Sequence, residues 1–284
     1  MNTSTEKVLA CVDQSASAQA VTEHAAWLAE RLSLSLALLH VIERHPRLAA
    51  AQDHSGALGV DAQNHLLQEL SDADAQRSRQ AREAGRLLLT GLRERAAELC
   101  SSDVDIRQRH GDLDETLLEL EPEVAHYVLG RQGEGHGRDA LGETPLWLLR
   151  SVRRPVWLVP ERFTPPSKVL VAFDGGASSR RAIAQWARSP LLQGLEILVL
   201  MAGESPKSSD VDAVVAGLQE AGLAASAWTQ AGAPEEVIPV FVREHGCDLL
   251  LMGAYSHSFW RSIVMGSKTQ EIVRRVDVTT WVQR

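Results

Sequence analysis

The chain has 284 residues, 44% of them hydrophobic, and a formal net charge of −8. That length and apolar content are sufficient for two globular domains. The acidic balance argues against a nucleic-acid partner, and no apolar run approaches the roughly 20 residues that span a bilayer. Because the N-terminus also lacks the pattern of a signal peptide, these features favour a cytoplasmic location without stable membrane insertion.

Short apolar segments alternate with amphipathic ones from the start of the chain. In the first half the strand-like segments are 7–12, 34–41, 104–109, 126–130 and 155–159. From near Arg44 to near Cys100, apolar residues recur at helical spacing, which predicts one long surface helix. This helix either covers the sheet or docks a partner.

The second half repeats the alternation. Its strand-like segments are 169–173, 195–201, 224–228, 248–252 and 278–282. Its helical segments are 177–188, 208–222, 233–245 and 268–275. Such alternation predicts an α/β fold in which helices cover both faces of a parallel sheet.

The two halves are copies of one unit. The sequence KVLACVD at 7–13 recurs as KVLVAFD at 168–174, which aligns Asp13 with Asp174. A duplicated unit of this length is a duplicated domain. We therefore predict a first domain over 1–160 and a second over 168–284, joined by the proline-containing linker ERFTPPS at 161–167.

Each copy ends in an apolar strand that contains tryptophan. The segment PVWLV carries Trp157, and TTWVQ carries Trp281. Each strand would lie at an exposed sheet edge unless it were paired. We expect the two to pair within one chain as a pseudo-dimer, with cysteines at Val159 and Val282 as a test, while a homodimer stays open.

The loop after the fourth strand of the second copy has the features of an anion site. Gly253 follows the strand directly, and Gly266 and Ser267 stand at the entry to a helix. Glycines let the backbone approach an anion, and the N–H groups of a helix N-terminus attract phosphate. Asp174 ends the first strand, where its carboxylate can accept hydrogen bonds from ribose or adenine. A plain strand-to-helix turn explains the glycines equally well.

At these residues the chain resembles the universal stress protein family in tandem form. The family pattern is G-x-x-G, nine residues and then G-S/T, and the second copy has Gly253, Ser256 in place of the second glycine, Gly266 and Ser267. The resemblance implies two Rossmann-like, adenine nucleotide alpha hydrolase-like domains with five-stranded sheets. It further implies ATP binding, with Mg²⁺ as an accompanying ion.

The resemblance also assigns roles by position. Asp174 would contact the adenosine, and Met252 and Gly253 would line the adenine and ribose pocket. Ser256, Gly266, Ser267 and Lys268 would face the phosphates.

The first copy has a degenerate version of this site, formed by Asp13, Val41, Gly130, Gly133 and Gly142. Glu143 stands where the second copy has Ser267, and a carboxylate there repels a triphosphate. Thr144 is expected to cap the helix that follows, with Pro145 in its first turn. Arg131, His136 and Arg138 are either anion contacts or solvated loop residues.

Catalytic patterns are weak. The histidines show no zinc-protease spacing, the serines no nucleophile elbow and the three cysteines no paired motif. His110 and His257 flank the loops and fit surface positions better than acid–base roles. The leading hypothesis is a stress-response protein that binds an adenine nucleotide in its second domain and acts through protein contacts. The alternatives are a slow ATP or adenylate hydrolase and a scaffold for a lipid-like or other small ligand.

Overall fold

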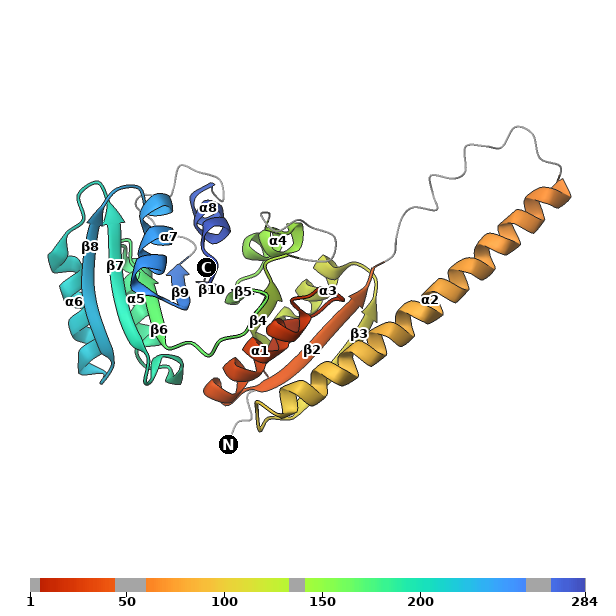
Figure 1. The fold of residues 1–284 in the computed structure, drawn as a ribbon, viewed down its shortest axis with the longest axis horizontal. Helices are drawn as coiled ribbons and strands as arrows, with labels where there is room; N and C mark the ends of the chain where they lie inside the picture. The colour runs from red at the N-terminus through yellow and green to blue at the C-terminus, as the bar shows by residue number, and fades with distance from the viewer. Residues whose placement is uncertain (1–5, 44–59, 133–140, 254–266, 284) are drawn as a thin grey trace.

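The computed structural model describes residues 6–43, 60–132, 141–253 and 267–283, with side chains omitted at 60–71 and 267 (Figure 1). The strands of the first half are β1 (Lys7–Cys11), β2 (Ser35–Ile42), β3 (Val104–His110), β4 (Val124–Gly130) and β5 (Val156–Val159). Its helices are α1 (Ala18–Leu32), α2 (Val60–Ala97), α3 (Leu113–Leu120), the 3₁₀ turn η2 (Glu121–Glu123) and α4 (Glu143–Ser151).

The second half has the same succession of elements. Its strands are β6 (Lys168–Ala172), β7 (Glu196–Gly203), β8 (Ala224–Ala231), β9 (Leu249–Gly253) and β10 (Thr279–Gln283). Its helices are α5 (Ala177–Trp186), the 3₁₀ turn η3 (Pro190–Leu192), α6 (Ser208–Glu220), α7 (Pro234–His245) and α8 (Ser267–Arg275).

All ten strands belong to one sheet, in the order β3-β2-β1-β4-β5-β10-β9-β6-β7-β8. Within each half every pair of neighbouring strands is parallel. The strand order of each half reverses beside its first strand, so β6 lies between β7 and β9. The predicted α/β class, with a five-stranded parallel sheet in each half, is confirmed.

Side chains from both faces of the sheet are buried, as a parallel sheet requires. Successive residues of β6 alternate between two cores: Val169 and Val171 belong to one, and Leu170 to the other. The first core also contains residues of α1, α2, α5 and α6, whereas the second contains residues of α3, α4, α7 and α8. Each core runs through both halves, so the sheet and its helices form one continuous body.

The last strands of the two halves join the sheet. β5 and β10 pair antiparallel, and Trp157 lies directly opposite Trp281. Their rings stack with centroids 5.4 Å apart and planes only 6° from parallel. The predicted pairing of the two terminal strands within one chain is confirmed.

The predicted long helix is present as α2, with 38 residues. Its C-terminal part packs on the sheet through buried Leu89, Leu92 and Ala96, while the helix extends well beyond the sheet (Figure 1). At 1.5 Å per residue α2 is about 57 Å long, roughly twice the length of an eight-residue strand. Among the described residues no helix combines the length and apolarity that a membrane span needs.

Candidate functional site

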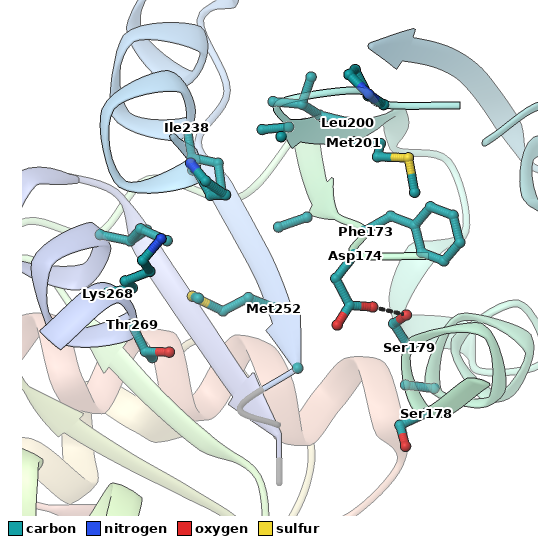
Figure 2. A pocket seen from close by; sticks show the side chains of 18 of the residues that line it. Phe173, Asp174, Ser178, Ser179, Leu200, Met201, Ile238, Met252, Lys268 and Thr269 are labelled. Atoms are coloured by element: carbon teal, nitrogen blue, oxygen red, sulfur yellow. Dashed lines mark hydrogen bonds between the residues drawn. The ribbon is translucent and has the colours of Figure 1, made fainter. Parts of the chain in front are cut away.

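The second half contains a cavity of about 940 Å³ at the carboxyl ends of β6, β7 and β9 (Figure 2). This volume lies within the range of small-molecule sites, which is roughly 300–1,000 Å³. The cavity also lies where the strand order reverses beside β6. In open α/β sheets, ligands bind at this kind of position because the loops from neighbouring strands diverge there.

Asp174 lies two residues beyond the end of β6 and lines the cavity. Its Oδ1 accepts hydrogen bonds from the backbone N–H of Gly176 at 2.9 Å and from the hydroxyl of Ser179. Both bonds use the same oxygen. The carboxylate is therefore fixed in orientation, and both of these bonds leave Oδ2 free of the described donors.

Gly175 makes the tight turn that brings Asp174 to the cavity. Its φ is +79°, a conformation that L side chains rarely adopt. A Cβ at this position would lie 2.7 Å from the Cε of Met201, which is itself part of the cavity wall. The backbone conformation thus favours glycine here, and a Cβ would additionally displace the terminal methyl group of Met201.

Apolar side chains line the cavity on more than one side. Phe173, Leu200 and Met201 lie on one side, Ile238 lies on the side of Lys268, and Met252 lies between them (Figure 2). These side chains come from the ends of three strands and from the second turn of α7, and all are at least nine-tenths buried. A flat, uncharged group such as a heteroaromatic ring fits a lining of this chemistry.

One end of the cavity is formed by the first turn of α8, which presents Lys268 and Thr269 (Figure 2). The Nζ of Lys268 lies 3.3 Å from Oε1 of Glu235 in α7. The other oxygen of this carboxylate, Oε2, is buried without a hydrogen-bond partner among the described residues. The N-terminus of α8 and the ammonium group of Lys268 supply donors for an anionic group at this end of the cavity, while Glu235 balances the charge of the lysine.

Four residues named from the sequence are brought together by the fold. Asp174, Met252, Gly253 and Lys268 all line the cavity, although they come from segments up to 94 residues apart. Ser267 is the first residue of α8, and its side chain is not described. Ser256 and Gly266 lie outside the described residues.

Several lining residues were not identified from the sequence. Met201, Ala202 and Gly203 at the end of β7 line the cavity, as do Ser179 of α5 and Pro234 of α7. The alignment of the two copies could have identified the β7 residues as lining residues. β2 and β7 share the offset of 161 residues that relates Asp13 to Asp174, and this offset places Val41 of the first copy over Ala202.

The first half has an equivalent aspartate turn, but a different side chain lies in front of its fourth strand. Asp13 accepts hydrogen bonds from the N–H and the hydroxyl of Ser15. A Cβ at Gly130 would lie 2.5 Å from Oγ of Ser17, a buried residue that precedes α1. At Gly253 a Cβ would meet nothing within 4 Å. Among the described residues, Ser17 fills the space in front of the fourth strand in the first half, whereas none of them fills the corresponding space in the second.

The remaining residues of the degenerate site are described in part. Val41 lies half-buried near the end of β2, and Gly142 is the N-cap of α4. Gly133, His136, Arg138 and His257 lie outside the described residues. His110, on the exposed end of β3, accepts a hydrogen bond from Arg82 of α2 at 3.1 Å.

Two expectations for the first half are wrong. The guanidinium of Arg131 is neither an anion contact nor a solvated loop group, because it donates to the carbonyl oxygens of Val273 and Val278 in the second half. Thr144 does not cap α4, because the helix begins at Glu143 and Gly142 occupies the N-cap without a side-chain bond. The glycine backbone there donates instead to the Arg131 carbonyl oxygen at 2.9 Å.

We next considered metal-ligand groups and reactive cysteines in the part of the chain that the structure describes. Within it, no group of three or more His, Cys, Asp or Glu side chains is arranged to hold a metal ion. Cys11, Cys100 and Cys247 are all free thiols. Burial raises the pKa of Cys11 to about 12 and that of Cys247 to about 11, so both are protonated and unreactive at neutral pH.

Comparison with known proteins agrees with this architecture. The chain is 28% identical over 284 residues to a universal stress protein of Synechocystis sp., covering 96% of the chain and 98% of the relative. It superposes on a universal stress protein of Archaeoglobus fulgidus with a TM-score of 0.69 at 16% identity, over 99% of this chain and 96% of the other. It also superposes on a protein of Pseudomonas aeruginosa described as a putative universal stress protein. The TM-score is 0.62 at 17% identity, over 98% of this chain and 92% of the other.

These superpositions establish a shared fold over nearly the full length of each chain. The sequence profile of the universal stress protein family itself matches twice, at residues 4–160 and 166–284. The two matches correspond to the two halves of the ten-stranded sheet. This chain therefore belongs to the universal stress protein family, with two family domains in tandem.

Proposed function

We propose that the chain binds an adenine nucleotide, with ATP as the leading candidate, in the cavity of its second domain. The observation that carries this proposal is the combination of three chemistries around one cavity. The apolar side chains suit the base, the oriented carboxylate of Asp174 suits ribose hydroxyls, and the first turn of α8 with Lys268 suits phosphates.

The same arrangement supports the following roles for individual residues. Met252 and Gly253 would contact the base and ribose, since they end the strand beside β6. Lys268 would exchange part of its interaction with Glu235 for a phosphate oxygen. Gly266, Ser267 and Ser256 complete the phosphate contacts in the family pattern. In the first domain, Ser17 in front of Gly130 and Glu143 at the start of α4 disfavour the same ligand.

We further propose that the protein responds to the nucleotide through protein contacts rather than turnover, in the cytoplasm. Mg²⁺ would enter as part of the nucleotide complex, coordinated by phosphate oxygens. Aspartate at 174 can accept hydrogen bonds, but both bonds to its Oδ1 hold it against the start of α5. Rapid hydrolysis requires a base that orients water, and Asp174 in this position is better placed to orient a ribose.

A matched pair of variants tests the assignment. Asp174→Asn removes the carboxylate at the cavity, and Asp13→Asn makes the same change at the equivalent position of the first domain. Titration calorimetry of the full chain with ATP and Mg²⁺ should show binding weakened about tenfold by Asp174→Asn, as expected for one lost charge-assisted hydrogen bond. Asp13→Asn should leave the affinity near that of the parent protein.

A third variant tests the cavity itself. Because a Cβ at Gly253 meets no atom of the described residues within 4 Å, Gly253→Val should fold normally and place its methyl groups in the ligand space. Its melting temperature should match the parent protein while ATP binding is lost. Loss of binding in Asp13→Asn but not in Asp174→Asn or Gly253→Val would move the site to the first domain. A retained non-nucleotide molecule in native mass spectrometry would replace the nucleotide as the ligand.

A further inference from the structure

We propose that Arg131, a residue of the first domain, positions the helix that forms the phosphate wall of the cavity in the second domain. The inference rests on the proposed function for the identity of the ligand. Its structural basis is a contact that crosses the joint between the domains and ends on α8.

The guanidinium of Arg131 holds the C-terminal end of α8. Nη1 donates to the carbonyl oxygen of Val273, and Nη2 donates to the carbonyl oxygen of Val278 and, at 2.9 Å, to Oγ1 of Thr280. Val273 lies in the last turn of α8, where carbonyl groups lack partners within the helix. A cation at this end is also favoured by the helix dipole.

The other end of the same helix forms part of the cavity. Lys268, Thr269 and Ile272 of α8 all line it (Figure 2). A helix of nine residues is about 14 Å long and moves as a rigid unit. A tilt or shift allowed at Val273 is therefore passed directly to Lys268 and Thr269.

The backbone of Arg131 is itself fixed within the first domain. Its N–H donates to the carbonyl oxygen of Val159 in β5 at 3.3 Å, and its carbonyl oxygen accepts from the N-cap Gly142 of α4 at 2.9 Å. One residue thus joins the start of α4 to the end of α8, the corresponding helices of the two copies. At the equivalent position the second copy has Ala254, so the repeat does not supply a reciprocal arginine.

The electrostatic state of Arg131 fits this role. Burial lowers its pKa to about 10, and Asp277 opposes the shift, so the side chain stays charged at neutral pH. Its Nε is buried without a hydrogen-bond partner among the described residues. The cation is stabilised chiefly by the carbonyl oxygens of the second domain, and removing it leaves those oxygens unpaired.

Arg31 provides a matched control. It also reaches from the first domain to the second, where Nε donates to the Leu191 carbonyl oxygen at 2.7 Å and Nη2 donates to that of Gln193. These acceptors lie in and beside η3, which precedes β7, whereas the cavity lies at the carboxyl ends of the strands. Arg31→Met therefore removes a cross-domain arginine without touching α8.

The experiment compares Arg131→Met, Arg131→Lys and Arg31→Met in the full-length protein. Hydrogen exchange of the ligand-free proteins should show the amides of α8 exchanging about tenfold faster in Arg131→Met than in Arg31→Met. ATP affinity should fall about tenfold in Arg131→Met, within the usual range of coupling between sites. Arg131→Lys keeps the charge but not the three-way donation, and it should recover only part of both effects.

The outcomes separate the two proposals. Equal α8 exchange in Arg131→Met and Arg31→Met would overturn the positioning role, whatever the ligand. So would faster α8 exchange in Arg131→Met with the ATP affinity of the parent protein. If the parent protein binds no ATP, the proposed function fails, and with it the claim that Arg131 positions a phosphate wall.

Discussion

Small side chains account for the difference between the two copies of the site. Ser17 fills the space in front of Gly130, whereas no residue that the structure describes fills the corresponding space in front of Gly253. Asp13 and Asp174 both accept a backbone N–H two residues on, so the repeat keeps the turn while changing what surrounds it. The aspartate turn is thus the same in both copies, whereas the contact of Ser17 with the fourth strand has no counterpart at Gly253 among the described residues.

Gly175 allows a test at single-residue resolution. Gly175→Ala should destabilise the fold by about 1–2 kcal/mol, because its φ of +79° is unfavourable for a residue with a Cβ. It should also weaken nucleotide binding, since the new methyl group displaces Met201 toward the cavity. Urea denaturation and ATP titration measure the two effects.

The control is Gly194→Ala. Gly194 has a similar φ of +73°, but a Cβ there meets nothing within 4 Å. It should lose a comparable amount of stability and keep the parent affinity. If Gly194→Ala weakened ATP binding as much as Gly175→Ala, the contact with Met201 would not be the cause.

The sequence allowed prediction of those cavity-lining residues that belong to a local motif. Asp174, Gly253 and Lys268 stand next to strand ends and a helix start, where a local pattern is informative. Ile238 and Met201 carry no such mark, because an apolar residue on a helix or strand looks the same whether it faces a core or a cavity. Arg131 was misassigned since its partners lie 142 or more residues away in the chain.

At the scale of elements, α2 is the main departure of the first copy from the second. It occupies the place that α6 takes in the second half, with 38 residues instead of 13. The spacing of its apolar residues predicted a helix, but it did not predict which part of the helix packs on the sheet. The strand beneath it sets that limit, because only the part of α2 that lies over the sheet can bury its apolar face.

A pair of leucines on α2 tests this packing. Leu89 is 2% exposed in the first core, whereas Leu87, two residues away, is 59% exposed. Leu89→Ala should lower the free energy of unfolding by about 2–4 kcal/mol through lost burial and the cavity it leaves. Leu87→Ala should change it by less than about 0.5 kcal/mol. Comparable losses in the two variants, measured by urea denaturation, would contradict the assignment of the buried face.

At the scale of the molecule, the tryptophan-bearing strands make one sheet out of two domains. The sequence indicated that β5 and β10 pair, but not their register, because the two apolar strands would be compatible with several alignments. The structure places Val282 opposite Val156, three residues from Val159. A cysteine crosslink across the joint therefore belongs at Val156 and Val282 rather than at Val159 and Val282.

Two histidines flank this joint, of which His24 is buried and His126 is half-buried. Nε2 of His24 in α1 lies 2.7 Å from Oγ1 of Thr279 in β10, and Nδ1 of His126 accepts from Nε1 of Trp157 at 3.2 Å. Burial lowers the pKa of each to about 4; for His24 the Ala20 carbonyl and Glu23 oppose the shift, whereas for His126 Arg154 adds to it. Protonation of His126 would remove the acceptor of Trp157, so acid should weaken the joint.

The pH dependence of unfolding tests this prediction. A folded-state pKa below the unfolded value of about 6.5 means that the unfolded chain binds more protons between about pH 6.5 and 4. Stability should therefore be full above pH 6.5 and fall as the pH drops through that window. His126→Gln keeps an acceptor for Trp157 without titrating, and it should reduce the fall by about 3 kcal/mol at 1.36 kcal/mol per pH unit. A His126→Gln profile parallel to that of the parent protein would exclude His126 as the source of the fall.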